Sequence, residues 1–404
     1  MIKSLIYRLL ERRHFWRYAS FSEIAELYTS RTLTIIAMYI ASGFGSVYIY
    51  QLGYSLQFIM IFWGLYYLLK MPLAFASALF AARFGPKHGI LISNLLYIPA
   101  MVALGFVPEV GVTGIILWGI PMCLSASLYH VCYLIDFSKV KNVEHAGKEI
   151  AFMNIIEKIA VGVSPVIGGV IALYFGPQLV MWVAAGFFVI AALPLMRSAE
   201  QVHTHQKIKI RGFPWQMAWR SLLAQVGIGF DVIATAIVWG LFIAVVMFPG
   251  MGNEIYVTLG ALSSVAIFAA IATSYAYGKL IDRRRGGDLL RISVIINSLV
   301  HVSRPFVATP LSIIGTNVAN EVATAGVVMS YTRGLFDTAD LSGHRIMYLC
   351  FIEAVANFGA VLGCAVAILC LSLLGSNDGM RAFFFVAAAF VLLTGTAHFQ
   401  LYRK

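Results

Sequence analysis

The stretch Gln178–Met196, QLVMWVAAGFFVIAALPLM, contains nineteen residues and no charge, and Arg197 follows it directly. A helix of about 20 largely apolar residues is long enough to cross the hydrocarbon core of a bilayer. The rest of the chain has the same character, because 60% of its 404 residues are hydrophobic and only 12% are charged. One soluble globule cannot bury so much apolar surface. The composition therefore excludes a soluble enzyme and a disordered chain, and it predicts a polytopic membrane protein.

Similar apolar runs recur along the chain, separated by short connections that mostly carry Gly, Pro, Asn or Asp. Such long continuous runs are typical of membrane helices and unlike the strands of a barrel. We therefore expect an all-α protein with twelve transmembrane helices in two six-helix halves. The candidate spans are 31–50, 57–82, 88–106, 112–135, 150–175, 178–196, 221–248, 255–278, 290–305, 310–332, 346–374 and 381–401.

The basic residues indicate the orientation of these spans. Of the 29 Lys and Arg residues, 24 fall in the termini and connections on one side, and only Arg381 falls in the connections on the other. Because basic residues are enriched in cytoplasmic loops, we expect both termini in the cytoplasm. The net charge of +11 then reports topology, and no nucleic-acid partner is expected.

The same pattern divides the chain into four parts. Residues 1–30 are expected to form a cytoplasmic segment with an amphipathic helix, in which apolar residues recur at helical spacing among basic ones. Residues 31–196 would form the first bundle, 197–220 a cytoplasmic loop between the bundles, and 221–404 the second bundle. His203 and His205 lie in that solvated loop, where such a pair is more often without function, so no metal site and no cofactor are expected.

Two short segments support an internal duplication. Ile150–Glu157 (IAFMNIIE) and Ile346–Glu353 (IMYLCFIE) open the fifth and eleventh spans, and both begin with Ile and end with Ile-Glu. They are 196 residues apart, close to half of the chain. Transporters are often built from such repeats, with the substrate site where the repeats meet.

One connection carries a recognisable motif. The turn between the eighth and ninth spans reads GKLIDRRRG, from Gly278 through Asp282 and Arg283 to Gly286. With the six-plus-six pattern, it resembles the Gly-x-Leu-x-Asp-Arg-x-Gly loop of the major facilitator superfamily, although Arg285 stands where the later Gly is expected. A carboxylate at this helix end can pair with Arg and hold the two halves in one state. The resemblance assigns this gate role to Gly278, Asp282 and Arg283.

The equivalent turn in the first half departs from this motif. Arg83, Gly85 and Lys87 match it, but Ala82 replaces the Asp. Because Ala82 has no carboxylate, we expect the gate in the first half to be weaker or replaced.

The fifth span contains Gly162-Val-Ser164-Pro165-Val-Ile-Gly168-Gly169. This segment is similar to the Gly-Pro-x-x-Gly-Gly motif of the proton-coupled exporters of the superfamily, with Ser164 in the first Gly position. Pro removes a helical hydrogen bond, and Gly permits bending and close packing. A structural bend and an exporter signature are therefore both open interpretations.

Ionisable residues inside the spans are the candidates for function, because a charge at the centre of a bilayer is costly and usually faces a cavity or a partner. The first, fourth, seventh and tenth spans line the cavity in the superfamily, which favours Asp231 and Glu321 as proton-coupling groups. A fixed structural ion pair, for example of Lys70 with a carboxylate, is the alternative. Arg31 and Arg304 lie near span ends and are expected to reach the interface. The candidate cavity residues are Asp231, Glu321, Glu353, Lys70 and Glu157.

These observations predict a secondary transporter that works by alternating access, most simply a proton-coupled exporter of an amphipathic compound. The alternatives are a proton symporter or facilitator for a polar metabolite and, from another class, a receptor or a membrane-embedded enzyme. The chain has no phosphate loop, and its outer connections are very short, so we do not expect an enzyme or an ATP-driven pump. We expect a monomer in a bacterial inner membrane whose partners are lipids, protons and a small-molecule substrate.

Overall fold

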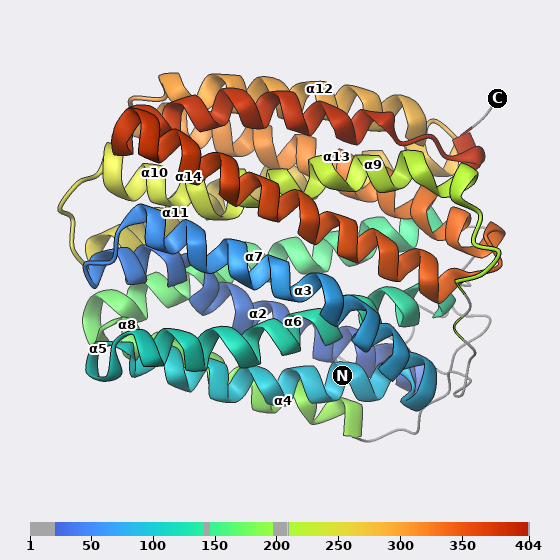
Figure 1. Cartoon of the computed structure of the whole chain (residues 1–404), viewed down its shortest axis with the longest axis horizontal. Coiled ribbons are helices and arrows are strands. Elements are labelled where there is room, and N and C mark those ends of the chain that lie inside the picture. The colour runs from blue at the N-terminus through green and yellow to red at the C-terminus, as the bar shows by residue number, and fades with distance from the viewer. Residues whose placement is uncertain (1–20, 141–145, 197–207, 209, 403–404) are drawn as a thin grey trace.

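The computed structural model describes residues 21–140, 146–196, 208 and 210–402. Within these residues all regular elements are helices (Figure 1). The first half contains α2 (Phe21–Gln51), α3 (Leu56–Phe84), α4 (Pro86–Gly105), the short α5 (Val107–Val110), α6 (Val112–Val140), α7 (Ala146–Phe175), α8 (Pro177–Ala192) and η1 (Pro194–Met196).

The second half begins with α9 (Trp215–Val232), which continues through the π-helical η2 (Ile233–Val238), α10 (Trp239–Phe242) and the π-helical η3 (Ile243–Met247). The remaining elements are α11 (Glu254–Asp282), α12 (Gly286–Ser303), η4 (Arg304–Phe306), α13 (Pro310–Leu341), α14 (Arg345–Val391), η5 (Leu392–Thr396) and η6 (Gln400–Tyr402). In Figure 1 the first half occupies the lower part of the molecule and the second half the upper part.

The expected number of crossings agrees with these helices. Nine segments of the described chain are long and apolar enough to cross a membrane. The longest of them contains Gly375, whose φ of 78° interrupts α14, and the chain turns back there (Figure 1). α12 and α13 are also long but more polar. The nine segments become ten when the two legs of α14 are counted separately, and α12 and α13 bring the number to twelve. The fold is therefore consistent with twelve crossings.

Some helices extend beyond the expected boundaries. α2 begins at Phe21 rather than at residue 31, and α9 begins at Trp215 rather than at residue 221. Helices do not have to end where the apolar run ends, so polar turns at the ends of spans remain helical. The amphipathic helix expected within residues 1–18 lies outside the described residues, and so does half of the loop 197–220.

Glycine–proline pairs form the tightest turns. Gly85 and Gly176 have φ of 92° and 87°, a conformation that favours glycine, and Pro86 and Pro177 begin the next helices. Gly85, which the sequence indicates as a gate residue, thus has a conformational role, because any residue with a side chain would strain the backbone at this φ. The chain reverses within one residue at each of these turns.

Two pairs of long helices make the main contacts between the halves: α7 with α11, and α3 with α14. The motif Gly162–Gly169 lies in α7, which runs as one helix through Pro165. The Gly162 carbonyl accepts a hydrogen bond from Ser264 of α11, and a Cβ on Gly169 would lie 2.8 Å from the Tyr256 carbonyl oxygen. Glycine lets the two backbones approach this closely.

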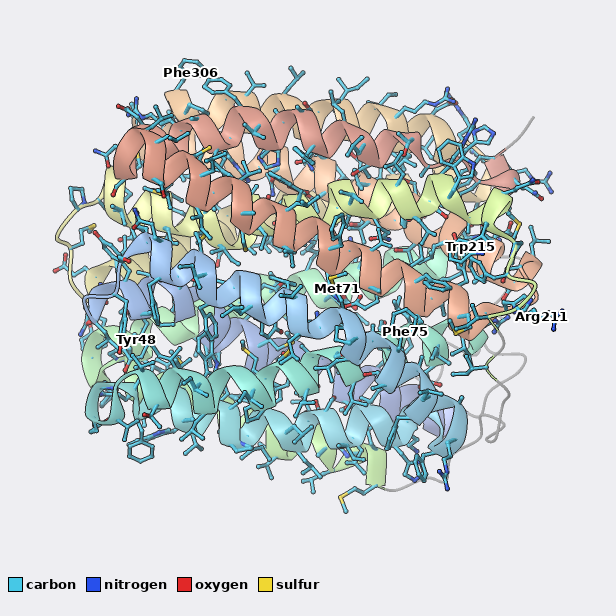
Figure 2. All side chains as sticks on the ribbon, viewed as in Figure 1. Tyr48, Met71, Phe75, Arg211, Trp215 and Phe306 are labelled. Atoms are coloured by element: carbon cyan, nitrogen blue, oxygen red, sulfur yellow. The ribbon has the colours of Figure 1, made fainter. Side chains whose placement is uncertain are left out.

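The two ends of the bundle differ in charge. Arg83, Lys87, Lys279 and Arg283 lie at the end where α3 meets α4 and α11 meets α12, which we call the basic end. Arg211 and Trp215 mark this end in Figure 2, and Tyr48 and Phe306 mark the opposite end. Between the ends, large apolar side chains are exposed on the outer faces of the helices, where a membrane would cover them.

Gly168→Ala tests the close packing of α7. The new Cβ would lie 2.1 Å from the Ile40 carbonyl oxygen of α2, so the helices must separate. We expect a loss of about 1–3 kcal/mol in stability, as for other overpacked cores. Thermal melting of the purified protein in detergent measures it.

Gly186→Ala is the matched control, because a Cβ there meets nothing within 4 Å. Alanine favours a helix by roughly 0.5–1 kcal/mol over glycine, so this variant should melt at the same or a higher temperature. Equal melting of the two variants would contradict the packing argument.

Candidate functional site

The charged residues inside the helices form ion pairs, and two of these pairs join the halves. Lys70, near the middle of α3, places its Nζ 3.2 Å from Glu353 Oε1 of α14. These side chains are only 5% and 13% exposed. Asn357, one turn further along α14, donates a hydrogen bond of 3.3 Å to the same carboxylate oxygen. This pair therefore bridges the two halves at mid-bundle.

The second bridging pair joins α7 to α13. Lys158 Nζ donates a hydrogen bond to Glu321 Oε2, and both side chains are partly buried. Lys158, which the sequence analysis does not single out, is the partner of one of its leading candidates. Met71, next to Lys70 on α3, marks the middle of the bundle in Figure 2, and Phe75 lies further along α3 toward the basic end.

The third pair lies within the first half. Arg31 Nε of α2 donates a 2.7 Å hydrogen bond to Glu157 Oε1 of α7. Arg31 Nη1 donates to the Tyr129 hydroxyl at 2.8 Å, and the guanidinium carbon lies 3.8 Å from the centre of the Tyr133 ring. Because Glu157 and Lys158 are consecutive, α7 contributes one partner to this pair and one to the bridge toward α13.

A cavity of about 180 Å³ lies beside Arg31, between the two halves and toward the basic end. α2, α6 and α7 supply most of its polar groups, and α13 contributes apolar side chains and Thr332. The cavity is therefore amphipathic. Its lining residues are Arg31, His130, Tyr133, Leu134, Asn154, Glu157, Val328, Met329, Thr332 and Phe336.

The opposite end of the bundle is closed at the junction of the halves. Gln51, the last residue of α2, accepts a 2.5 Å hydrogen bond from the Tyr256 hydroxyl and donates one of 2.7 Å to the Gly252 carbonyl. Next to it, Leu56 and Met60 of α3 pack with apolar residues of α10 and α14. The cavity at Arg31 therefore lies on the basic-end side of this closure.

Asp231 lies elsewhere, inside the second half. Its Oδ1 is 2.7 Å from His301 Nε2, and Asn297 Nδ2 donates to its Oδ2 at 2.9 Å. Arg304 Nη1 is 3.0 Å from His301 Nδ1, so Nδ1 must accept this bond. His301 Nε2 then carries the proton and donates it to Asp231. The imidazole is neutral and connects the Arg304 cation to the Asp231 anion.

Arg304 corrects an expectation, because it does not reach the interface. Its side chain is fully buried, it donates to Asn320 Oδ1 at 3.0 Å, and it lies 4.9 Å from the Trp239 ring centre. It also contacts the Ala234 carbonyl in π-helical η2 at 3.4 Å. Arg31 likewise pairs with Glu157 inside the bundle instead of reaching the interface.

Sequence reasoning did not connect Asp231 with His301 and Arg304, although a signal was present. Asn297, His301 and Arg304 are spaced by four and three residues, so they share one face of α12 and its continuation. A polar stripe on an otherwise apolar membrane helix indicates a buried partner on a neighbouring helix.

The gate residues lie at the basic end in both halves. Arg83 is in the last turn of α3, Gly85 forms the turn, and Lys87 is buried in the first turn of α4. Gly278 and Asp282 end α11, and Arg283 caps it. The structure thus places the two turns at equivalent positions, and the gate role of both stays a prediction.

Comparison with known proteins identifies the family. The sequence profile of the Major Facilitator Superfamily matches residues 27–338. The chain belongs to the Major Facilitator Superfamily. No curated protein sequence matches it significantly. The superfamily assignment makes this an integral, multi-pass membrane protein whose function is transport.

Solved structures of transporters share the superfamily fold with this chain. One is a bacterial homologue of the iron transporter ferroportin in an outward-facing state with soaked iron, with 14% identity, a TM-score of 0.66, and coverage of 93% of this chain and 98% of that one. Another is the nucleoside transporter NupG (D323A mutant), with 12% identity, a TM-score of 0.66, and coverage of 92% and 97%. At such identities the likeness shows the fold alone. In the described part of this chain, no group of three or more His, Cys, Asp or Glu residues could hold a metal ion.

Arg304→Met tests the buried network of the second half. It keeps most of the apolar stem but leaves Asp231 without its cation, and breaking a buried pair typically costs about 3–5 kcal/mol. We expect a correspondingly large fall in the melting temperature of the purified protein. The double variant Arg304→Met with Asp231→Asn should recover part of this loss, because it removes both charges.

Arg285→Gln is the control, since Arg285 pairs with Asp288 at 3.7 Å on an exposed surface. Exposed pairs contribute at most about 1 kcal/mol. If Arg304→Met melted like Arg285→Gln, the network would not be a stabilising element.

Proposed function

We propose that this chain is a proton-coupled secondary transporter that moves a small amphipathic compound by alternating access between its two halves. The proposal rests on one observation. Two ion pairs, Lys70–Glu353 and Lys158–Glu321, join the halves at mid-bundle beside an amphipathic cavity. A transporter of this fold must separate its halves at each end in turn, so groups that bond across the junction bias which state is populated.

Protonation gives these pairs a coupling role. A carboxylate that gains a proton loses its charge, and its attraction to the facing lysine falls. The free-energy difference between the joined and separated states then depends on the proton. Glu321 and Glu353 satisfy this requirement because each faces a cation of the other half.

The remaining predicted residues have other proposed roles. Lys70 is the counter-charge of Glu353, and Glu157 fixes Arg31 at the cavity. Asp231, which the sequence favours together with Glu321, bonds only to groups of its own half among its described contacts. We therefore assign proton coupling to Glu321 and Glu353, and a structural role in the second half to Asp231.

The direction of transport has two candidate forms. Export by antiport is supported by the likeness of Gly162–Gly169 to the exporter motif. Symport is the second candidate, and charge balance favours it for a substrate that is an anion. Glu157, Glu321 and Glu353 each face a basic side chain, so a proton and an anionic substrate that bind together leave the interior charge unchanged.

The membrane setting completes the proposal. The basic end would face the cytoplasm of a bacterial cell, because basic residues are retained on that side. Lipid would cover the apolar outer faces of the helices, and the twelve-helix monomer would be the working unit. In a variant whose five native cysteines are replaced, Arg211→Cys should react with a membrane-impermeant maleimide only in lysed cells, and Gly252→Cys also in intact cells; the reverse pattern would contradict this orientation.

Glu321→Gln and Glu353→Gln test proton coupling. Proteoliposomes are supplied with a panel of labelled amphipathic acids, amines and alcohols, with and without an imposed pH gradient. For the compounds that the wild-type protein carries, both variants should keep exchange at equal pH but lose gradient-driven accumulation, because glutamine cannot bind the coupling proton.

Glu254→Gln is the matched control, because Glu254 is exposed in the first turn of α11 at the opposite end. It should accumulate substrate like the wild type. Wild-type flux that ignores the pH gradient would exclude proton coupling, and normal accumulation by both glutamine variants would exclude these two residues. The sign of the gradient that drives accumulation separates antiport from symport.

A further inference from the structure

The cavity beside Arg31 has one charged wall and one apolar wall. We propose that it binds an amphipathic organic anion, with the acidic group on Arg31 and the apolar body against α13. This inference rests on the proposed function, because it names the substrate class that would pass between the halves. It does not depend on the direction of transport or on the coupling residue.

Arg31 is held in a fixed orientation that faces the cavity. Tyr133 lies beneath the guanidinium plane, and two of the three nitrogens are bonded, Nε to Glu157 and Nη1 to Tyr129. Nη2 forms no hydrogen bond with the described residues. A guanidinium that is already oriented loses little entropy when it binds a carboxylate, and it offers a planar pair of donors.

Glu157 shows that this guanidinium accepts a carboxylate. Its side chain is 23% exposed and lines the same cavity. An acidic ligand in the cavity would bind to Nη2 and compete with Glu157 for the remaining donors. Glu157 is thus an internal competitor of the ligand, and removal of its charge should strengthen binding of an anion rather than weaken it.

The apolar wall limits the body of the ligand. Val328, Met329 and Phe336 of α13 line the cavity together with polar groups of α2 and α7. The volume of about 180 Å³ is enough for one ring with a short arm, since a cavity of roughly 150 Å³ can hold benzene. A ligand of this shape would contact both halves, so its binding would change the free energy needed to separate them.

Three probes with the same body test the charge preference. The purified full-length protein in detergent is titrated by calorimetry with 3-phenylpropanoate, 3-phenylpropylammonium and 3-phenylpropanol, which differ only in the head group. We expect the anion to bind and the ammonium and the alcohol to give no binding heat. Binding of the ammonium or the alcohol as tight as that of the anion, or no binding by any probe, would overturn the proposal.

Two variants test the site in opposite directions. Arg31→Gln should abolish binding of 3-phenylpropanoate, and Glu157→Gln should tighten it by about tenfold, because one charged competitor for the Arg31 donors is gone. If Arg31→Gln does not fold, Glu157→Gln alone decides, and unchanged or weaker binding by it overturns the proposal. Arg345→Gln removes an arginine that pairs with Asp340 outside the cavity, and it should bind the anion like the wild type.

The outcome also separates this inference from the proposed function. If the anion fails to bind while gradient-driven flux still depends on Glu321 and Glu353, the substrate class is wrong and the transport mechanism stands. If the anion binds at Arg31 and flux ignores the pH gradient, the site stands and proton coupling is wrong.

Discussion

The cost of a charge in a membrane is the constraint on which the interior of this protein depends. An ionised side chain at mid-bilayer costs about 2.5–3.5 kcal/mol on insertion scales unless it finds a partner or water. Arg31, Lys70 and Lys158 each lie against a carboxylate, and Arg304 reaches Asp231 through neutral His301. The pairing of these charges determines which helices must be neighbours.

The contacts between the halves have two physical forms with different consequences. Where α7 meets α11, glycine brings backbones so close that any side chain would push them apart. Where α3 meets α14 and α7 meets α13, the contact includes an ion pair. Close packing favours one geometry and depends little on solution conditions. An ion pair depends on protonation and on competing charges, so it is the element through which a proton or a ligand can change the balance between states.

Much of the architecture could be predicted from the sequence, because apolar length and basic asymmetry are properties of single segments. The helical class, the turns at Gly85 and Gly176, and the break before the last crossing follow from such local signals. That Lys70 pairs with a carboxylate was one of the expectations, but the identity of each partner could not be predicted, because it depends on how helices rotate about their axes. The sequence indicated Glu321 and Lys70 as important, and the polar stripe that contains His301 indicated a buried partner. It did not show that this partner is Asp231, or that Glu321 pairs with Lys158.

The consecutive residues Glu157 and Lys158 connect the candidate binding site to the junction of the halves. Neighbouring residues on a helix point about 100° apart, so α7 presents one charge to α2 and the next to α13. In the proposed binding mode, a ligand that drew Arg31 away from Glu157 would leave that carboxylate next to Lys158, where it would compete with Glu321 for the ammonium group. The bridge between the halves would then be weaker when the cavity is occupied. The proposed binding at Arg31 would thus be linked to separation at Glu321 through a single turn of α7, without any need for a longer chain of contacts.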